Sequence, residues 1–318
     1  MEKFRWAFIG SGSIARKVAS DISKGNHCVV SVYSRNFEKA KQLADRFSAK
    51  AYETAEQAIS AEDVDGVYIA TPHTSHVEYS LMALKMHKSV LCEKPVAVSE
   101  KEVQLLIDTA KENGTYFAEA MWTWFSDVAL TVKDWVKNDR VGDVQSVKIH
   151  YAFPGIKMAE DSRVRDPLTA GGALLDIGIY PITYCYNLFG YPDKIRCEGT
   201  VDKGIDINEH ITLTYGDLNC ELYISLEHLK EKLSLKGTMG RIYLPVFHAS
   251  PVAVLTGRKG NKVFLGKTDY ITEFDRVVKE IREGKTESDY VPFKSTAECM
   301  RIMDECRRQM NLKYPFED

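Results

Sequence analysis

The sequence contains no long apolar segment and no paired cysteines. Its 318 residues include no window of about 20 apolar residues, the length that a helix needs to cross a bilayer. The opening apolar run ends at Gly10, which is too early for a secretory signal peptide. The seven cysteines are odd in number and scattered, without a Cys-x-x-Cys pair, so we expect reduced thiols and no metal site. These absences argue against secreted and membrane proteins and lead us to expect a cytoplasmic protein.

A strong excess of charge of either sign is also missing. The 42 basic residues against 45 acidic ones leave a formal net charge of −3. A dedicated binder of nucleic acids or membrane surfaces usually shows a basic excess, so neither partner is expected. Hydrophobic residues at 44% and charged residues at 27% are ordinary for globular proteins, and the length favours two domains.

The first 121 residues alternate short apolar runs with helical patterns. Strands are predicted at 5–9, 29–33, 64–70, 89–92 and 116–120, and helices between them at 14–23, 37–47, 75–87 and 103–113. Strands that alternate with helices of this length predict βαβ units and a parallel sheet. The last of these helices follows Ser99-Glu100-Lys101-Glu102, which has the spacing of a capping box.

The remaining residues, 122–318, follow another pattern. One long strand is predicted at 144–153, a helix near 172–188 and shorter strands at 195–201, 210–215, 221–226, 233–235, 241–244 and 252–255. Turn signals join several of these strands, which favours a mostly antiparallel sheet backed by helices. Helices near 127–138, 269–283 and 295–309 complete the prediction. The fold class is therefore α/β, with a dinucleotide-binding domain at 1–121 and a substrate-binding and oligomerisation domain of α+β type at 122–318.

Gly10-Ser11-Gly12-Ser13-Ile14-Ala15 fits G-x-G-x-x-[GA] between the first strand and the first helix. Gly10 permits the tight turn, Gly12 lets the backbone approach a pyrophosphate, and the helix start at Ser13 and Ile14 offers unpaired N–H donors. A glycine-rich turn without a ligand is the alternative. The position at the start of a βαβ series favours a dinucleotide.

The end of the second predicted strand bears on which dinucleotide is bound. NAD sites place an acidic residue there, but this chain has Ser34 and Arg35. A hydroxyl and a guanidinium suit the 2′-phosphate of NADP. Arg35 as an exposed surface residue is the alternative, and NAD stays possible.

Three further segments carry candidate chemistry. Thr71, Pro72, His73 and His76 follow the third predicted strand, and Glu93, Lys94 and Pro95 follow the fourth. Both lie at the carboxyl edge of a doubly wound sheet, where such sheets bind ligands. Asp176 and Tyr180 in Gly171–Tyr180 share a helix face. His73-x-x-His76 has no third ligand, so no metal is expected.

Together these segments resemble the Gfo/Idh/MocA oxidoreductases over almost the whole chain. The resemblance implies a Rossmann domain, a second domain with an open sheet, and oxidation of sugar or polyol hydroxyls. It matches the family's lysine at Lys94 and its aspartate at Asp176. Most members have a histidine where this chain has Tyr180. That departure, with Glu119-Ala120-Met121-Trp122-Thr123, resembles the branch of dihydrodiol and NADP-linked xylose dehydrogenases, in which lysine and tyrosine are the catalytic pair.

The chemistry of this pair is coherent. A tyrosine, with an ordinary pKa of about 10, is a weak base at neutral pH, and a nearby lysine ammonium favours its phenolate. We therefore expect Tyr180 as acid/base, Lys94 as its partner and Asp176 as an orienting group, with Asp176 as a structural acid the alternative. The residues expected to bind cofactor are Gly10, Gly12, Ser13, Ile14, Ser34, Arg35, Thr71, Pro72, His73, His76, Glu93 and Lys94. Those expected to contact substrate are Trp122, Phe153, Arg163 and Tyr180.

Several alternatives stay open. Trp122, Trp124 and Phe125 can line a substrate wall or form core, and core is slightly favoured. Arg163 can serve the substrate or a surface ion pair. An NADP-dependent dehydrogenase is the leading function; an NAD-retaining glycoside hydrolase and a non-catalytic dinucleotide sensor are the others. The resemblance also implies a homodimer through the second sheet, for which we expect Val147, Ile149 and Tyr151 to form one face.

Overall fold

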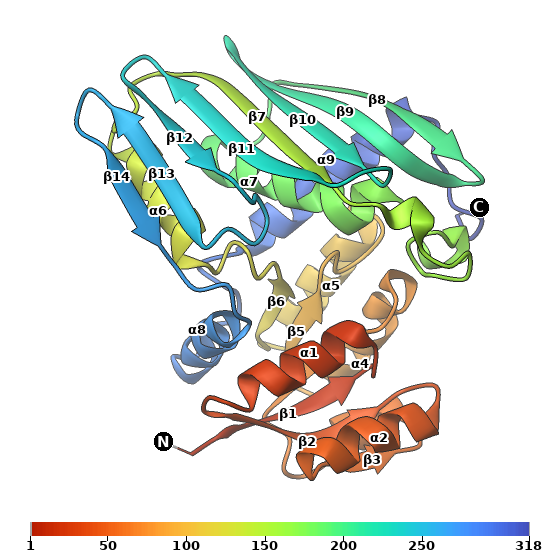
Figure 1. Ribbon diagram of the computed structural model, residues 1–318. Coiled ribbons are helices and arrows are strands. Elements are labelled where there is room, and N and C mark those ends of the chain that lie inside the picture. Colours follow the sequence, from red (N-terminus) through yellow and green to blue (C-terminus); the bar gives the residue numbers. More distant parts are fainter. Residues whose placement is uncertain (1, 318) are drawn as a thin grey trace. The chain divides into compact units, whose positions relative to one another are not determined.

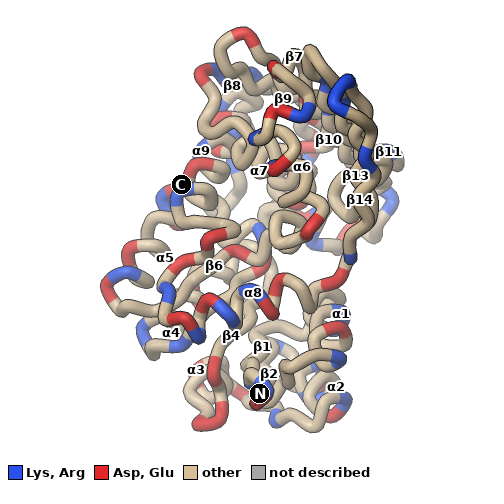
Figure 2. The backbone as a smooth tube through the Cα atoms, turned by 90° about the vertical axis from the view of Figure 1, so that its left-hand side faces the viewer, with Lys and Arg blue, Asp and Glu red and all other residues tan. Residues whose placement is uncertain are grey.

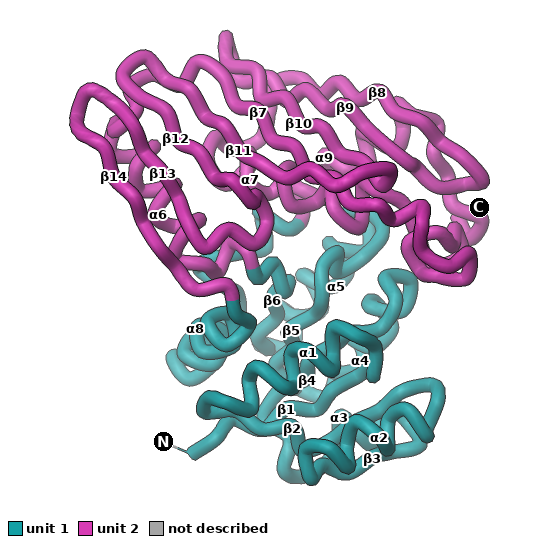
Figure 3. The backbone as a smooth tube through the Cα atoms, viewed as in Figure 1, with its two compact units in different colours: residues 1–122, 269–296 teal, residues 123–268, 297–318 magenta. Residues whose placement is uncertain are grey.

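The computed structural model describes residues 2–317, which form two compact units. The first unit comprises Met1–Trp122 and Asp269–Thr296, and the second comprises Thr123–Thr268 and Ala297–Asp318 (Figure 3). Lys and Arg are interspersed with Asp and Glu along both units (Figure 2), as the near-neutral composition suggests. None of the helices described combines the length and apolar character required to cross a bilayer.

The first unit is built on a six-stranded parallel sheet in the order β3-β2-β1-β4-β5-β6 (Figure 1). The strands are β1 (Phe4–Ile9), β2 (His27–Tyr33), β3 (Lys50–Tyr52), β4 (Gly66–Ile69), β5 (Ser89–Glu93) and β6 (Phe117–Ala120). Every residue of β4 and β6 is buried, as expected for strands covered on both faces. The order of the strands places the carboxyl ends of β1 and β4 side by side at the centre of the sheet, which confirms the doubly wound fold.

Helices connect these strands, and most of their boundaries follow local rules. They are α1 (Ser13–Ile22), α2 (Phe37–Phe47), α3 (Ala55–Ile59), α4 (His76–Lys85) and α5 (Glu100–Glu112). Asn36, Thr54 and Ser99 accept hydrogen bonds from the first turns of α2, α3 and α5, which satisfies otherwise unpaired N–H groups. The short elements β3 and α3 were not predicted, because three to five residues carry too little periodicity to be recognised.

The second unit contains an eight-stranded sheet in the order β14-β13-β12-β11-β7-β10-β9-β8. Its strands are β7 (Val144–Ala152), β8 (Lys194–Asp202), β9 (Ile205–Tyr215), β10 (Leu218–Ser225), β11 (Lys230–Gly237), β12 (Gly240–Leu244), β13 (Val252–Gly257) and β14 (Lys262–Leu265). All neighbours are antiparallel except β7 and β10, which confirms the prediction of a mostly antiparallel sheet. The edge strand β14 was not predicted, because its side chains are largely exposed.

The helices of the second unit lie against one face of this sheet (Figure 1). They are α6 (Asp127–Lys137), a π-helical turn at Leu174–Gly178, α7 (Ile179–Phe189) and most of α9 (Phe293–Gln309). Val147 and Ile149 are fully buried and Tyr151 is 7% exposed, so these three residues face the helices. The expectation that they form an oligomer face is therefore wrong. Side chains alternate along a strand, and Lys148 and His150 point to the other face.

Helix α8 (Ile271–Arg282) belongs to the first unit, although the sequence assigned all of 122–318 to one domain. Phe274 is fully buried, and its ring lies 4.9 Å from that of Trp6 and 5.3 Å from that of Tyr68. The Nε2 atom of His27 on β2 lies 2.9 Å from Oδ1 of Asp275. The apolar face of α8 thus packs on residues of the first sheet that lie more than 200 positions earlier in the chain.

Candidate active site

The glycine-rich loop joins β1 to α1, as its motif predicts. Gly10 has φ +113°, and a Cβ at this residue would overlap the carbonyl of Ala70 at the end of β4. Gly12 is the N-cap of α1 and has no atom within 4 Å of the place where its Cβ would lie. Ala15 is fully buried against the sheet. The loop therefore leaves open backbone at the start of α1, where N–H groups can meet a phosphate.

Ser34 and Arg35 follow β2 and precede the Asn36 cap of α2. Ser34 is half-buried and Arg35 is exposed. The tyrosine pair Tyr33 and Tyr79 lies beside them, with ring centroids 5.9 Å apart. Burial and the hydrogen bond with Tyr33 raise the pKa of Tyr79, and the nearby charge of Arg35 opposes this rise. This end of β2 thus has an exposed cation next to an aromatic pair.

The segment after β4 is held by His76, the first residue of α4. His76 is fully buried, and its ring nitrogens lie 2.9 Å from the carbonyl oxygen of Thr71 and 2.8 Å from that of Pro95. His73 is also buried, with its ring centroid 5.8 Å from that of His76. Through His76, the loop after β4 is linked to the turn that follows Lys94.

Lys94 follows β5 and is half-buried, and the Lys94–Pro95 peptide bond is cis. The preceding Glu93 is buried and accepts a hydrogen bond of 2.5 Å from the hydroxyl of Tyr68. Burial and the Glu93 charge raise the pKa of Tyr68 well above its usual range. Tyr68 is therefore a donor to Glu93 across the physiological range of pH.

Two more acids, Glu119 and Glu273, are buried and interact electrostatically with Glu93. Glu119 on β6 accepts a hydrogen bond of 3.3 Å from the backbone N–H of Val96, and Glu273 lies on α8. Burial raises the pKa of Glu119 to about 7, although the Val96 N–H, Thr296 and Lys94 lower it. Burial and the charges of Glu93 and Glu119 also raise the pKa of Glu273. Carboxylates that lie close together in a buried site repel one another, which favours their protonated forms.

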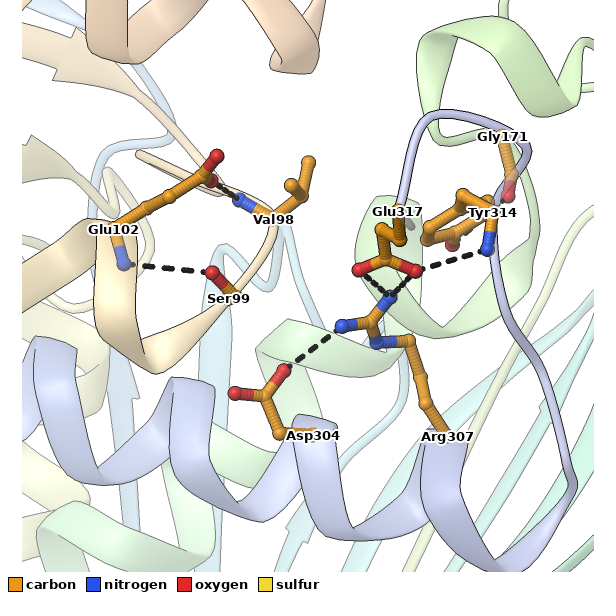
Figure 4. Close-up of polar contacts among 8 residues, drawn as sticks. All are labelled: Val98, Ser99, Glu102, Gly171, Asp304, Arg307, Tyr314 and Glu317. Carbon is orange, nitrogen blue, oxygen red and sulfur yellow. Dashed lines mark hydrogen bonds and ion pairs between the residues drawn. The ribbon is translucent and has the colours of Figure 1, made fainter.

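The turn after Pro95 ends in the predicted capping box (Figure 4). Ser99 Oγ accepts from the N–H of Glu102 at 3.4 Å, and Glu102 Oε2 accepts from the N–H of Val98 at 2.9 Å. These two bonds fix the start of α5 a few residues after Lys94.

In the second unit, Asp176 lies in the π-helical turn and is paired with Arg163. Arg163 Nη2 donates to Asp176 Oδ1 at 2.8 Å, and the Asp176 side chain is 9% exposed against 44% for Arg163. π-helical turns are rare and frequently occur at functional sites. The structure thus brings together two residues that the sequence suggested separately.

Tyr180 lies in the first turn of α7 among aromatic rings. Its ring centroid is 5.6 Å from those of both Tyr151 and His248, which stack on each other at 4.5 Å. His248 Nδ1 lies 2.8 Å from Glu231 Oε2. His248 and Glu231 were missed at the sequence level, since neither belongs to a motif. For Tyr151, the only signal in the sequence was its position in the alternating pattern of the predicted strand.

The other aromatic residues that the sequence suggested for the substrate site occur in both units. In the first unit, the ring of Trp122 lies 5.2 Å from that of Tyr270. In the second, Trp124 and Phe125 are buried core residues, and Phe153 follows β7 and is half-buried. No group of three or more potential metal ligands occurs in residues 2–317.

The bend before the π-helical turn is held by the C-terminal segment (Figure 4). The Tyr314 hydroxyl donates to the carbonyl of Gly171 at 3.2 Å. Arg307 on α9 donates to Glu317 at 2.8 Å and to Asp304 at 3.1 Å, and Glu317 accepts from the N–H of Tyr314 at 2.9 Å. No sequence motif pointed to this support.

Comparison with protein families gives two matches along the chain. Residues 4–120 match a family model described as an oxidoreductase family with an NAD-binding Rossmann fold. Residues 129–243 match the model of the GFO/IDH/MocA C-terminal domain.

Individual relatives extend over nearly the full length. The chain is 29% identical to the trans-1,2-dihydrobenzene-1,2-diol dehydrogenases of Mus musculus and Danio rerio, over 98% of each chain in both alignments. A 3-ketoreductase from Actinomadura kijaniata, solved with NADP and TDP-benzene, superposes with a TM-score of 0.85 at 22% identity, over 97% of this chain and 98% of that one. An aldose-aldose oxidoreductase from Caulobacter crescentus, complexed with glycerol, gives 0.87 at 18% identity, over 98% of both chains.

Proposed function

The chain belongs to the Gfo/Idh/MocA family of oxidoreductases, and from this membership we propose that it is an NADP-dependent dehydrogenase. Its substrate is the hydroxyl group of a sugar, a polyol or a trans-dihydrodiol, or the corresponding carbonyl. Relatives with full-length similarity are named for a dihydrodiol, and structural neighbours for aldoses and a 3-keto group. When bound, the nicotinamide supplies the hydride chemistry.

The observation that carries this proposal is the open backbone at Gly12. A Cβ at this N-cap would meet nothing, and the first turn of α1 has no acidic side chain to compete for its N–H groups. A pyrophosphate at this place would receive backbone hydrogen bonds and the favourable end of the helix dipole.

Ser34 and Arg35 support NADP over NAD. In the proposal the Ser34 hydroxyl and the exposed Arg35 guanidinium bind the 2′-phosphate, and no acidic side chain stands in this segment to bind a free ribose hydroxyl. Arg35→Ala should weaken NADP binding by roughly ten- to a hundredfold, the value of a charge-assisted hydrogen bond, and leave NAD binding within about twofold. Fluorescence titration of both cofactors measures this. Arg46→Ala, at the other end of α2, is the control, and equal losses for NADP and NAD in Arg35→Ala contradict the assignment.

In the proposed mechanism, Tyr180 exchanges the hydroxyl proton of the substrate. Its ring is held by Tyr151 and His248, which restricts the direction of the phenol O–H. Lys94 favours the phenolate and binds the substrate oxygen, and Asp176, held by Arg163, orients the substrate. In the reductive direction the phenol returns its proton to the alkoxide.

Tyr180→Phe tests this role. We expect kcat to fall by about 10²- to 10⁴-fold, which is the usual contribution of general acid–base catalysis, with NADP affinity unchanged. Steady-state kinetics and a cofactor titration measure the two quantities. Tyr184→Phe, a buried tyrosine one turn farther along α7, is the matched control and should keep kcat within about threefold. Near-full turnover by Tyr180→Phe would overturn the assignment.

A substrate screen tests the reaction class. NADP and NAD are offered separately with pentoses, hexoses, inositols, aromatic trans-dihydrodiols and their carbonyl counterparts, and nicotinamide absorbance is followed. Glycoside cleavage without net change in absorbance would indicate a retained cofactor and a hydrolase. No turnover with any compound, at measurable cofactor affinity, would indicate a sensor.

The uncovered face of the second sheet supports the homodimer that we also propose. Among the described residues of the second unit, no helix covers this face (Figure 1). It holds a groove of about 660 Å³, in which the ring of Tyr223 stacks between those of His150 and His210 at 4.5 and 4.4 Å. Tyr243 on β12 is 44% exposed. A second copy of the chain is the occupant that we propose for this face.

A further inference from the structure

Two buried acids of the second unit lie outside every motif and outside the proposed mechanism. Asp206 and Glu209 are both on β9, with exposed fractions of 0% and 3%. Residues three apart in a regular strand point to opposite faces. Here the register moves from Thr200↔Asn208 to Val201↔Asp206, so one extra residue bulges from β9 between them. The bulge turns both carboxyl groups to the same buried side.

Asp206 holds the bend that leads to Asp176 and Tyr180. Its Oδ2 accepts a hydrogen bond of 2.5 Å from the N–H of Leu174, the first residue of the π-helical turn. Gly172 has φ +121°, and a Cβ at that position would overlap Asp206 Oδ1. Glycine at 172 is therefore required by the close approach of this carboxyl group as well as by the backbone conformation.

If both residues were ionised, most of their carboxylate oxygens would lack a hydrogen-bond donor. Within residues 2–317, neither Asp206 nor Glu209 forms an ion pair with a Lys, Arg or His side chain. Asp206 Oδ1 and both oxygens of Glu209 are buried without a hydrogen-bond donor. Two adjacent buried anions with three of their four oxygens lacking a donor are costly, because each anion loses its hydration and repels the other.

A single proton lowers this cost, because it neutralises one of the two anions and supplies a hydrogen-bond donor. A protonated Glu209 can donate to Asp206, and burial together with the Asp206 charge and this hydrogen bond raises the pKa of Glu209 well above its usual range. The other titratable groups that interact with the pair are Cys197 on β8, Cys306 on α9 and Tyr314 in the C-terminal segment. None of these three is a cation that could replace the proton.

We propose that Asp206 and Glu209 form a carboxylate–carboxylic acid pair that shares one proton and positions the Leu174–Tyr180 segment for catalysis. Asp206 is the ionised member, because its Oδ2 already accepts from the backbone of Leu174. Glu209 is the neutral donor that keeps Asp206 in place. Both are positioning residues, since they act through the π-helical turn and through α7. The catalytic consequence rests on the proposed function, whereas the protonation state does not.

Infrared spectroscopy tests the protonation state directly. The folded protein at neutral pH should show the C=O band of a buried carboxylic acid that shifts on ¹³C-glutamate labelling. Because Glu119 and Glu273 can contribute similar bands, the comparison is the difference spectrum between wild type and Glu209→Gln, which should lose one band. Glu198→Gln, an exposed acid on β8, should leave the acid region unchanged. An unchanged acid region in Glu209→Gln would show that Glu209 is ionised and would overturn the pair.

Kinetics test the positioning role. Glu209→Gln keeps a neutral donor for Asp206 and should retain kcat within about twofold. Glu209→Leu removes the donor at similar volume and should lower kcat by roughly ten- to a hundredfold, as expected for misplacement of a catalytic group, with NADP affinity unchanged. Assays are made below the unfolding transition of each variant, followed by circular dichroism. Equal kcat values for the Gln and Leu variants would overturn the positioning role. Absence of turnover in the wild type would instead refute the proposed function, and the infrared result would stand.

Discussion

At the scale of the residue, Glu119 couples the stability of the first unit to pH. Its pKa rises from the ordinary value of about 4.5 in the unfolded chain to about 7 in the folded protein, chiefly through burial. Because the pKa of Glu119 is higher in the folded state, the folded protein binds this proton more tightly than the unfolded chain does. The contribution of this proton to stability is complete below about pH 4.5. That contribution is lost as the pH rises through about 7.

Glu119→Gln should remove this dependence, because the amide stays neutral. The free energy of unfolding of the variant, relative to that of wild type, should therefore increase between pH 4.5 and pH 8 by about 3 kcal/mol, which is the linkage value of the shift. Urea unfolding at both pH values measures the change. Glu53→Gln, an exposed acid, is the control. A pH-independent difference between wild type and Glu119→Gln would show that Glu119 titrates normally.

At the scale of the element, α8 shows how a late segment completes an early fold. Local signals predicted a helix near 269–283, and the structure has one at Ile271–Arg282. Its place in the first unit depends on Phe274, Val277 and Val278, which are buried. Amphipathic periodicity identifies such a face but does not say which sheet receives it.

Phe274→Ala should lower the free energy of unfolding by about 3–5 kcal/mol, because the ring is fully buried between Trp6 and Tyr68. Hydrogen exchange should show the loss in β1 and β4, and chemical unfolding gives its size. Lys279→Ala, on the exposed side of the same helix, should stay within about 0.5 kcal/mol of wild type. A loss below about 1 kcal/mol in Phe274→Ala would mean that α8 contributes little to the first unit.

At the scale of the whole molecule, the proposed homodimer makes the uncovered sheet face an interface. Tyr243→Asp places a charge on this face and should convert the dimer to monomer, since a buried unpaired carboxylate is costly. Sedimentation velocity of both proteins measures the change in mass. Leu105→Asp, at a residue of α5 that is 49% exposed, is the matched control and should stay dimeric. A wild type that sediments as a monomer at micromolar concentration would contradict the dimer.

What the sequence determined by itself are the features that depend on neighbours in the chain. The glycine loop before α1, the alternation of strands and helices, the capping box at Ser99 and the mostly antiparallel second sheet all follow from short-range periodicity and turn chemistry. The family resemblance rests on the same short motifs.

Only the tertiary structure decided which distant residues meet. It placed the ring of His248 beside that of Tyr180, paired Arg163 with Asp176, and brought the carboxyl group of Asp206 against Gly172. The physical reason is that burial, ion pairing and a shared proton depend on distances between residues far apart in the chain. Asp206 and Glu209 look like ordinary strand residues until a bulge turns both to the same side, where burial raises the pKa of Glu209.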